Sequence, residues 1–241
     1  MEDSHYDILY ETEAVHWWYR VRRKIAIDLI KEYTGADKDK KIADIGCGTG
    51  ALLHELSVLG KVYGIDSSAK AISYCRQRGL QNLTTGNIDN LPFADDEFDV
   101  ALCLDVLEHL PDDRRAISEI RRVVRPGGLV IIFVPAFSFL FGVSDIVSKH
   151  FRRYGSRELV KKIKEENLEI LRCSYFNFFL FLPILAVRKL VNRFKLPMKS
   201  ENKFNNRFVN KILYVFFYLD SIILKYIDYP FGVSLLVVAK K

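Results

Sequence analysis

Three glycines and two acids are the residues of this chain whose spacing is typical of a nucleotide site. Gly46, Gly48 and Gly50 follow Asp44 at the end of a short apolar run, and Asp66 ends the next apolar run 22 positions later. Glycine lets the backbone turn sharply after a strand and approach a ligand closely, because it has no Cβ. A carboxylate at this spacing can accept both hydroxyls of a ribose. Together they predict a nucleotide-binding loop with an acidic partner.

The spacing of the glycines separates two classes of nucleotide site. The loop reads G-x-G-x-G, whereas a dinucleotide-binding loop reads G-x-G-x-x-G and would have its third glycine where this chain has Ala51. A pyrophosphate cradle is therefore disfavoured, and a nicotinamide-dependent oxidoreductase ranks last among the functions that we consider.

Several segments resemble the class I S-adenosylmethionine-dependent methyltransferases, in which D-x-G-x-G-x-G is the cofactor loop. The segment 86–100 (GNIDNLPFADDEFDV) is similar to the lead into that family's fourth strand. The segments LDVLEHL and 121–135 (RRVVRPGGLVIIFVP) are similar to its fourth helix and fifth strand. The resemblance covers about residues 41–135 and is to methyltransferases of type 11/12, including members of glycan, lipid-linked and quinone pathways. It implies S-adenosyl-L-methionine as the cofactor.

The same resemblance assigns residues to each part of the cofactor. It implies that Asp66 and Ser67 hold the ribose and that Asn87 and Ile88 face the adenine. Asn87 stands where the family has an aspartate, but an amide carbonyl still accepts a hydrogen bond from an adenine amino group; Asp89 either takes over this role or is a turn residue. The remaining cofactor-binding candidates are Asp44, Gly46, Cys47, Gly48, Gly50, Cys103 and Leu104.

The pattern along the chain predicts a doubly wound α/β fold with a seven-stranded Rossmann-like sheet. Apolar spacing predicts an N-terminal helix over residues 16–33, and from Lys41 short apolar runs alternate with helical ones. Residues 168–176 and 230–241 are the expected last two strands, and the resemblance makes them antiparallel. We therefore expect a helical cap (1–40), a core (41–175 and 230–241) and a helical insert (176–229) at the ligand edge.

The composition fits a folded protein of 241 residues with 49% apolar and 27% charged residues. The four cysteines form no C-x-x-C pair, so neither a zinc site nor a disulfide framework is indicated. The first residues carry acids and no apolar run after a basic start, which predicts that no secretory signal is present. A cytoplasmic location is the expectation.

The segment Asp105–His109 has two interpretations. Asp105 and Glu108 form an N-cap and capping-box pattern at the start of a helix, which needs no chemistry. Alternatively, Asp105, Glu108 and His109 share a helix face. Some quinone and small-RNA methyltransferases place a metal on an E-x-x-E-H sequence that DVLEH resembles, but we expect no metal here. His109 is a candidate general base, because the pKa of histidine suits proton transfer near neutrality.

Candidate acceptor-binding residues come from the segment D-x4-H-x2-RY, residues 145–154, which resembles a substrate-side loop of methyltransferases in glycan and lipid-linked sugar pathways. His150 is the second candidate base. In the alternative interpretation, the arginines are solvated and Tyr154 packs on the helix that opens at Ser156. Substrate-binding candidates are Trp18, from the N-terminal helix, with Asp145, Arg153 and Tyr154.

The insert combines apolar and basic stretches. Residues 176–187 are apolar for too short a distance to span a bilayer, and Asp220 interrupts the second apolar run, 211–227. Between Arg188 and Lys211 eight basic residues stand against one acid, a local net charge of +7. This pattern predicts a surface that lies in an anionic membrane interface. The alternative is a hydrophobic lid or a dimer interface.

We therefore expect methyl transfer to oxygen rather than nitrogen of a small or lipid-linked acceptor, by a peripheral protein on the inner face of the membrane. One alternative is an RNA methyltransferase or RNA-binding protein, since aromatic and basic side chains can hold single strands. Nucleic acid is disfavoured, because the aromatic runs are very apolar and no known RNA module is appended. Another alternative is a membrane-tethered subunit that binds the cofactor without turnover. The sequence does not fix the oligomeric state.

Overall fold

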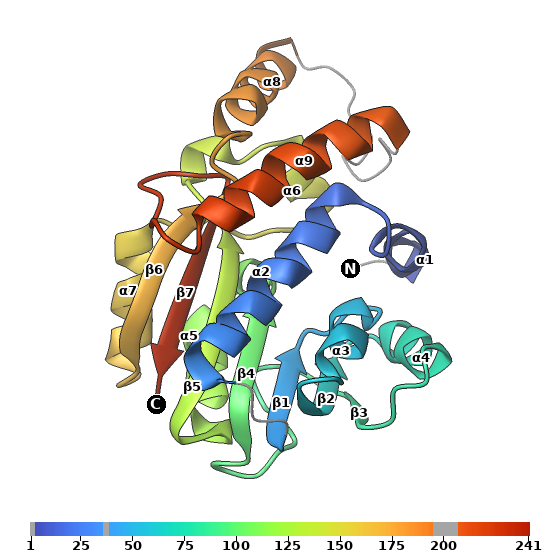
Figure 1. Ribbon diagram of the computed structural model, residues 1–241, viewed down its shortest axis with the longest axis vertical. Helices are drawn as coiled ribbons and strands as arrows, with labels where there is room; N and C mark the ends of the chain where they lie inside the picture. Colours follow the sequence, from blue (N-terminus) through green and yellow to red (C-terminus); the bar gives the residue numbers. More distant parts are fainter. Residues whose placement is uncertain (1–2, 36–38, 195–206) are drawn as a thin grey trace.

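The computed structural model describes residues 3–35, 39–194 and 207–241. Its centre is a seven-stranded sheet in the order β3-β2-β1-β4-β5-β7-β6 (Figure 1). β7 is antiparallel to both of its neighbours, and the other pairs are parallel, which confirms the predicted doubly wound sheet. The strands are β1 (Lys40–Ile45), β2 (Gly60–Asp66), β3 (Leu83–Thr85), β4 (Phe98–Leu104), β5 (Val124–Pro135), β6 (Glu169–Phe176) and β7 (Ser234–Lys240).

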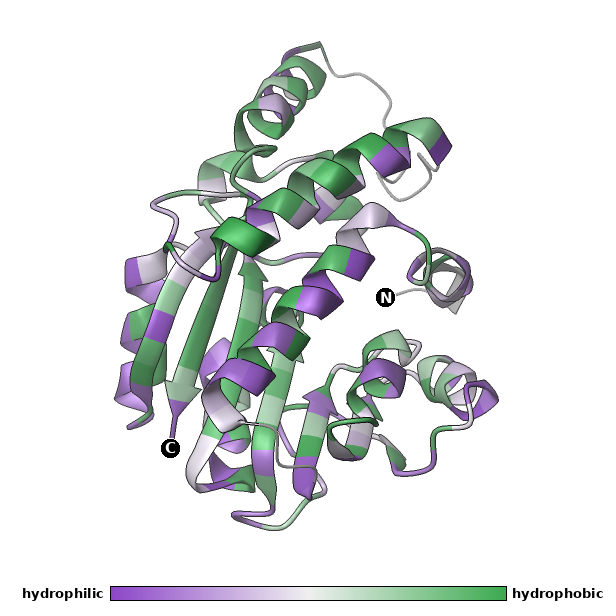
Figure 2. Ribbon diagram, in the orientation of Figure 1, coloured by the Kyte–Doolittle hydropathy of each residue, from purple (hydrophilic) through white to green (hydrophobic). Residues whose placement is uncertain are grey.

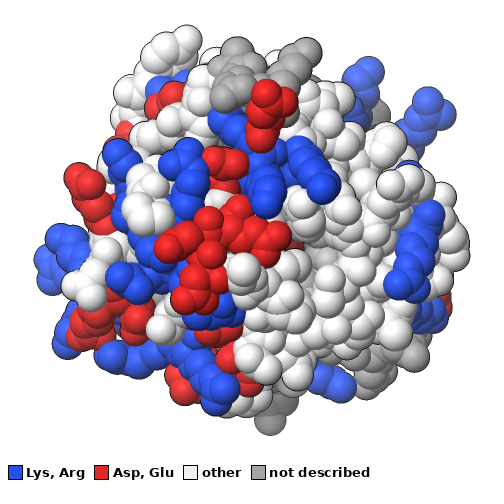
Figure 3. Space-filling model, turned by 90° about the horizontal axis from the view of Figure 1, so that it is seen from below, with Lys and Arg blue, Asp and Glu red and all other residues white. Residues whose placement is uncertain are grey.

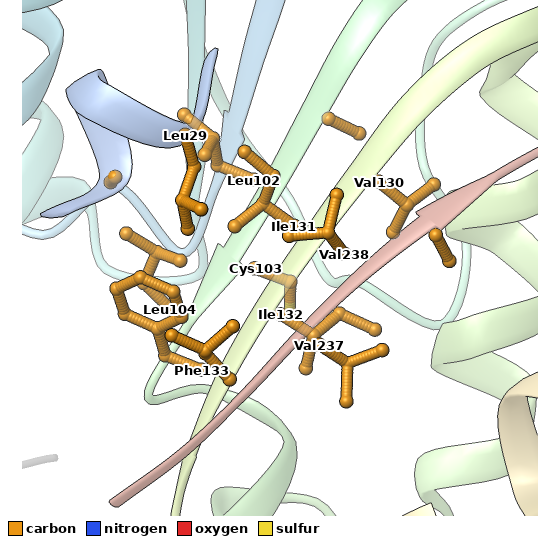
Figure 4. Close-up of a cluster of buried hydrophobic side chains, with 14 of the residues drawn as sticks. Leu29, Leu102, Cys103, Leu104, Val130, Ile131, Ile132, Phe133, Val237 and Val238 are labelled. Atoms are coloured by element: carbon orange, nitrogen blue, oxygen red, sulfur yellow. The ribbon is translucent and has the colours of Figure 1, made fainter. Parts of the chain in front are cut away.

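The core lies where β4, β5 and β7 run side by side. These strands are apolar at nearly every position because helices cover both faces of the sheet, as expected of buried strands. Leu102, Ile131 and Val238 are all fully buried, and Figure 4 shows them in one cluster with Leu29 of helix α2. The helices that flank the core are α2 (Trp17–Thr34), α3 (Ala51–Leu56), α4 (Ala69–Gln77), α5 (Asp113–Val123) and α7 (Ser156–Glu165).

Helix α2 confirms the N-terminal helix predicted from apolar spacing. Its buried residues include Val21, Ile25 and Leu29, which recur every four positions and so share one face. His16 is its N-cap and accepts a hydrogen bond from the backbone N–H of Trp18. Because α2 is anchored in this way, its polar face can reach the carboxyl ends of the strands.

A second N-terminal helix, α1 (Asp3–Thr12), was not expected from the sequence. It packs on α4, where the Tyr10 and Tyr74 rings stack with their centroids 4.3 Å apart. The Asp7 carboxylate pairs with the Lys70 ammonium at 2.7 Å. These contacts place α1 beside the glycine loop, on the side of the sheet that the sequence assigns to the cofactor.

The insert contains two helices, α8 (Phe181–Phe194) and α9 (Arg207–Ile223), as predicted. α9 lies along α2 (Figure 1), where the Trp18 ring stacks on Phe217. Asp220 is fully buried, and its carboxylate accepts hydrogen bonds from the backbone N–H groups of Asn177 and Phe178. The acid that interrupts the apolar run therefore fastens α9 to the end of β6. In the described part of the chain, no helix is long and apolar enough to cross a membrane.

Three short segments complete the ligand edge of the sheet. They are the 3-10 turns η1 (Leu107–His109) and η2 (Ser138–Leu140) and the helix α6 (Val143–Val147). The division of the chain into cap, core and insert stays a prediction.

Candidate active site

The glycine loop leaves β1 with a backbone that only glycine tolerates. Gly46 and Gly50 have φ angles of 80° and 85°, in the left-handed region. A Cβ on Gly46 would lie 2.3 Å from Cγ2 of Val106, and one on Gly50 would lie 2.8 Å from the Cys75 sulfur. The loop thus packs directly against the segment that follows β4, as the register of Ile45 opposite Cys103 requires.

Asp66 joins the loop to the end of β2. Its carboxylate accepts hydrogen bonds from the backbone N–H groups of Gly48 and Ser68, each at 2.9 Å, and from the Tyr6 hydroxyl at 3.2 Å. Burial and the Asp66 carboxylate raise the pKa of Tyr6, so this hydroxyl stays protonated and donates. The sequence pattern brought the loop and the acid together correctly. It missed Tyr6, because no periodicity marks a contact between residues 60 positions apart.

A buried acid, Glu13, holds the loop from the other side. Its carboxylate accepts from the Thr49 hydroxyl and pairs with the Arg78 guanidinium at 2.7 Å. Arg78 also donates to the backbone carbonyl of Thr49 at 2.8 Å. Burial raises the pKa of Glu13 although both Arg78 and Arg23 oppose the shift. Sequence analysis missed this clamp, since Glu13 stands in a stretch with no recognisable motif.

Asp44 is the buried acid at the start of the loop. Burial raises its pKa to about 7, against the attraction of the Arg22 guanidinium, and the nearby carboxylates of Asp66 and Glu13 raise it further. Arg22 comes from α2 and also donates to the backbone carbonyl of Leu104 at 3.3 Å. A carboxyl that titrates near neutrality in this place suits a ligand that brings its own positive charge.

The other predicted cofactor residues differ in what they can offer a ligand. Ser67 and Asn87 are exposed at the ends of β2 and β3, and Ile88 is buried behind Asn87. The Cys47 side chain is buried, with its sulfur 3.9 Å from that of Cys75. Cys103 and Leu104 have buried side chains in the core (Figure 4), so only their backbone atoms are placed to face a cofactor.

The predicted role of Asp105 was wrong. We expected Asp105 to cap an α-helix with Glu108 as its capping partner, or to share a helix face with Glu108 and His109. Asp105 instead has a φ of 56° and pairs with Arg22 at 2.7 Å, and the segment forms only the 3-10 turn η1. The spacing of three and four residues therefore does not describe a common α-helical face here.

Glu108, His109 and His150 lie together instead. Glu108 is fully buried, and His150 Nε2 is 4.0 Å from its Oε1 atom. The His109 and His150 rings are 4.6 Å apart and nearly perpendicular. Burial raises the pKa of the Glu108 carboxyl well above its usual range, and the Asp105 charge adds to the shift. The two candidate bases, predicted from different segments, thus belong to one polar cluster.

Asp145 orients the His150 ring of this cluster through the ring nitrogen that faces away from Glu108. It is 1% exposed, and its carboxylate contacts His150 Nδ1 at 2.9 Å, Arg153 Nε at 2.8 Å and Arg188 Nη1 at 3.1 Å. Burial opposes its ionisation, but the hydrogen bond from His150 and the charge of Arg153 outweigh burial and lower its pKa to about 2. Asp145 and Arg153 are buried, so the structure places them as supports of His150.

Tyr154 and Trp18 also have structural partners. Tyr154 is fully buried and its hydroxyl donates to Asp113 at 2.8 Å, which agrees with the alternative that it packs beside α7. The Trp18 ring stacks on Phe217 and on Phe176, and these two rings also stack on each other, so that the three form one aromatic cluster. A direct contact of either residue with an acceptor stays a prediction that nothing in the structure supports.

Comparison with known proteins decides the family. A model described as a methyltransferase domain matches residues 43–132, the stretch that holds the glycine loop, Asp66 and the Glu108 turn. Residues 43–132 therefore form a methyltransferase domain of the class I S-adenosylmethionine-dependent kind. The cofactor of this domain family is S-adenosylmethionine. The assignment of the glycine loop, Asp66 and Asp44 to that cofactor stays a prediction.

Curated relatives of the chain are named for different kinds of methyl transfer. The ubiquinone biosynthesis O-methyltransferase of Bordetella bronchiseptica is 27% identical over 54% of this chain and 61% of its own length. The probable tRNA methyltransferase 9B of Homo sapiens is 33% identical over 56% of this chain and 30% of its own. The chain therefore spans less than two thirds of either relative.

Solved structures agree on the fold of the whole methyltransferase. A possible histamine N-methyltransferase from Thermotoga maritima superposes with a TM-score of 0.62 at 16% identity, covering 99% of this chain and 95% of its own. The additions at both ends of the matched domain are thus compatible with one methyltransferase fold.

Proposed function

We propose that this protein transfers a methyl group to a hydroxyl oxygen of a small or lipid-linked acceptor, and that it works at an anionic membrane surface. The observation that carries the proposal is the polar cluster of Glu108, His109 and His150, which lies directly beyond the segment that packs on the glycine loop. The O-methyltransferase of Bordetella bronchiseptica supports the choice of oxygen.

The cofactor supplies an activated methyl group on a sulfonium ion, so the protein has to align the acceptor, exclude water and take away a proton. A hydroxyl must lose its proton during transfer, and histidine is suited to this near neutrality. The ionised Asp145 carboxylate can only accept, so His150 Nδ1 carries the hydrogen and Nε2 faces the cluster. A proton that leaves the acceptor is therefore received at the His109 and His150 pair.

Two elements exclude water from this edge of the sheet. Helix α1 reaches over the glycine loop, where the Tyr6 hydroxyl donates to Asp66. Helix α8 is tied to the acceptor side by Arg188, which also donates to the Ser144 hydroxyl at 2.9 Å. Elements that cover an alkylation site favour transfer to the bound acceptor over hydrolysis.

The test of the reaction is product analysis by mass spectrometry with S-adenosylmethionine and two matched acceptor sets, phenolic or quinol hydroxyls and primary amines. We expect methyl ethers from the hydroxyl set, with rates at least about 100-fold lower in His150→Gln, as for loss of a general base. His54→Gln is the matched control, because His54 is an exposed histidine of α3. Methylated amines alone, or a His150→Gln variant as fast as the wild type, would contradict the proposal.

The proposal of a membrane surface is supported by the insert. α8 and α9 are predominantly hydrophobic (Figure 2), and large apolar side chains on them remain exposed. Soluble monomers rarely expose contiguous apolar surface of this kind. These exposed side chains include Leu182, Leu190, Phe194, Phe208, Ile212, Phe216 and Leu219.

The basic residues of the insert divide into two groups. Arg188 was predicted to face the membrane, but it is bonded to Asp145 inside the protein. Lys189, Arg193, Arg207 and Lys211 are exposed on α8 and α9. Two of them, with Arg20 of α2, line a hollow of about 430 Å³, which suits an anionic headgroup. The predicted positions Lys195, Lys199 and Lys203 lie outside the described residues.

Co-sedimentation with vesicles tests the membrane surface. We expect binding to vesicles that contain anionic lipid, little binding to neutral vesicles, and weaker binding as salt increases. Replacing Arg207 and Lys211 by glutamate should abolish binding to the anionic vesicles. The matched control replaces Lys61 of β2 and Arg76 of α4, which lie outside the insert, and it should leave vesicle binding unchanged. Equal binding of neutral vesicles, or binding of RNA in place of vesicles, would overturn this part of the proposal.

A further inference from the structure

Glu108 has an environment that the fold alone does not explain. Its side chain is fully buried, and among the described residues neither carboxyl oxygen has a hydrogen-bond partner. Burying a carboxyl group without a partner costs free energy, and most buried polar atoms in proteins are paired. A structural glutamate would be bonded to a backbone N–H or a cation, as Asp145 and Asp220 are. We infer that the site around Glu108 is formed to hold a ligand that would pair with its carboxyl oxygens.

Two histidines lie close to the Glu108 carboxyl group. One ligand atom from each of Glu108, His109 and His150 can be chosen so that all lie within 4.8 Å of one another. The three residues come from two segments, which are joined by a hydrogen bond from the backbone N–H of Phe151 to the carbonyl of Glu108 at 2.8 Å. The cluster is thus held by the backbone and does not depend on flexible surface side chains.

The surroundings of His150 add an independent observation. Asp145 accepts from Nδ1 of His150 and is itself held by Arg153 and Arg188. In metal sites a carboxylate commonly orients a ligating histidine in this way and leaves the other ring nitrogen for the metal. Here the nitrogen left over is Nε2, the atom that faces Glu108.

We propose that Glu108, His109 and His150 bind one divalent transition-metal ion. Two imidazoles and one carboxylate favour zinc, manganese, iron or cobalt over magnesium and calcium, which prefer oxygen ligands. Three protein ligands leave positions open for water or substrate. Ligand atoms at about 2.0–2.2 Å from one ion are roughly 3–3.5 Å apart, so the three side chains must draw together by about 1 Å on binding. Asp105 is not a ligand, since it pairs with Arg22.

The site also narrows the class of acceptor, and this step rests on the proposed function. An ion that expands from four to five ligands has two open positions beside the three side chains, and it then favours acceptors with two adjacent oxygens, such as a catechol. Coordination lowers the pKa of the acceptor hydroxyl, so its proton leaves to water. A lone pair of that oxygen then forms the new C–O bond while the C–S bond breaks, and its electron pair stays on sulfur to give a neutral thioether. With the ion bound, His109 and His150 do not receive the proton themselves; they hold the ion that makes the acceptor hydroxyl acidic.

Calorimetric titration of Zn²⁺ into chelator-treated protein tests the site. We expect one Zn²⁺ per chain with micromolar or tighter affinity in the wild type and in His54→Gln, the control that keeps the cluster. Glu108→Gln and His150→Asn should each bind at least 10- to 100-fold more weakly. Zn²⁺ should also raise the melting temperature of the wild type but not of Glu108→Gln. Absence of binding, or equal affinity in Glu108→Gln, would overturn the proposal.

A parallel titration with S-adenosylhomocysteine shows whether each variant is folded and separates the two proposals. Glu108→Gln should bind this compound as tightly as the wild type, because Glu108 is outside the cofactor loop. If hydroxyl acceptors are methylated at an unchanged rate by protein that binds no metal, the metal inference fails and the proposed function stands. If Zn²⁺ binds at the cluster but only amines are methylated, the proposed function fails and the metal site stands.

Discussion

The two sides of the ligand edge differ in how completely their polar groups are paired. On the cofactor side, Asp66 accepts three hydrogen bonds and Glu13 is bonded to Thr49 and Arg78. On the acceptor side, Glu108 is buried and its carboxyl oxygens have no hydrogen-bond partner among the described residues, and the helices α8 and α9 leave large apolar side chains exposed. The difference supports the proposal that the protein prepares the cofactor side by itself, whereas ligands complete the acceptor side.

The opposite edge of the sheet, to which we assign no ligand, provides a comparison. Figure 3 views the molecule from this edge, and acidic and basic side chains are interspersed over its left half, beside a broad uncharged area. They form exposed pairs such as Asp99 with Arg125 at 2.6 Å and Asp95 with Arg122 at 2.7 Å. Exposed pairs of this kind contribute little to stability. The unusual features of the molecule are therefore concentrated at the ligand edge.

The largest effect should come from removing Asp145, the buried carboxylate that holds the acceptor side together. Asp145→Ala leaves the Arg153 and Arg188 guanidinium groups buried without the carboxylate that pairs with them. Breaking a buried ion pair in this way typically lowers the free energy of unfolding by about 3–5 kcal/mol. Denaturant unfolding should show this loss. Asp7→Ala is the control, because the Asp7 pair with Lys70 is exposed and should contribute less than about 1 kcal/mol. A loss of under 1 kcal/mol in Asp145→Ala would mean that the acceptor side is not held by this carboxylate.

The second largest effect should be a loss of cofactor affinity when Asp66 is removed from the cofactor side. Asp66→Ala should weaken binding of S-adenosylhomocysteine at least about 100-fold, or roughly 2.7 kcal/mol, because it removes the acceptor that pins Gly48 and is placed to hold the ribose. Calorimetric titration measures this change. Asp95→Ala is the control, since Asp95 is exposed at the opposite edge of the sheet, where it pairs with Arg122. Unchanged affinity in Asp66→Ala would remove the basis for assigning the cofactor to this side.

The same difference between the two sides explains what could be predicted from the sequence. The sheet, α2 and the contact between the glycine loop and Asp66 were predicted correctly, because periodicity and glycine spacing are local signals. Contacts between distant segments carry no such signal, and Tyr6 and Glu13 were missed for that reason. Helix α1 was missed with them.

On the acceptor side, the errors came from treating a turn as a helix. Asp105 has a positive φ angle and an ion pair with Arg22, so it could not be the cap that the spacing suggested. His150 was chosen as a separate base, but only the fold shows that it faces Glu108. The predicted substrate contact Asp145 proved to be fully enclosed, because the insert supplies Arg188 as its partner. None of this is visible in a local motif.

A third prediction concerns the unpaired carboxyl of the acceptor side. Glu108→Met should raise the free energy of unfolding of the metal-free protein by about 1–3 kcal/mol, because an apolar side chain of similar size removes the cost of burying an unpaired carboxyl. Chelator-treated samples should be compared by denaturant unfolding. In the control Glu165→Met, at a partly exposed position in α7, the change should stay within about 0.5 kcal/mol. A destabilised Glu108→Met would imply that Glu108 already has a strong partner in the metal-free protein.

The smallest expected effect is the pH dependence of cofactor affinity, which we attribute to Asp44. Its folded pKa is about 7, whereas an aspartate in an unfolded chain titrates near 4. If the ionised carboxylate attracts the ammonium group of the cofactor, affinity for S-adenosylhomocysteine should fall as pH is lowered through 7. Between pH 8 and pH 6 the fall should be about 10-fold, or roughly 1.4 kcal/mol.

The same pKa has the opposite effect on stability, which makes the prediction specific. The folded state binds the Asp44 proton more tightly than the unfolded state, so this group contributes most to stability below about pH 4 and loses its contribution as pH rises to 7. Arg22, Asp66 and Glu13 are the charged groups around it, and Glu13 also has a raised pKa. Asp44→Asn leaves these neighbours in place, so it should remove only the trends due to Asp44. Titrations and unfolding curves at pH 6, 7 and 8 measure both. If affinity still falls 10-fold in Asp44→Asn, another group of the cofactor side controls it.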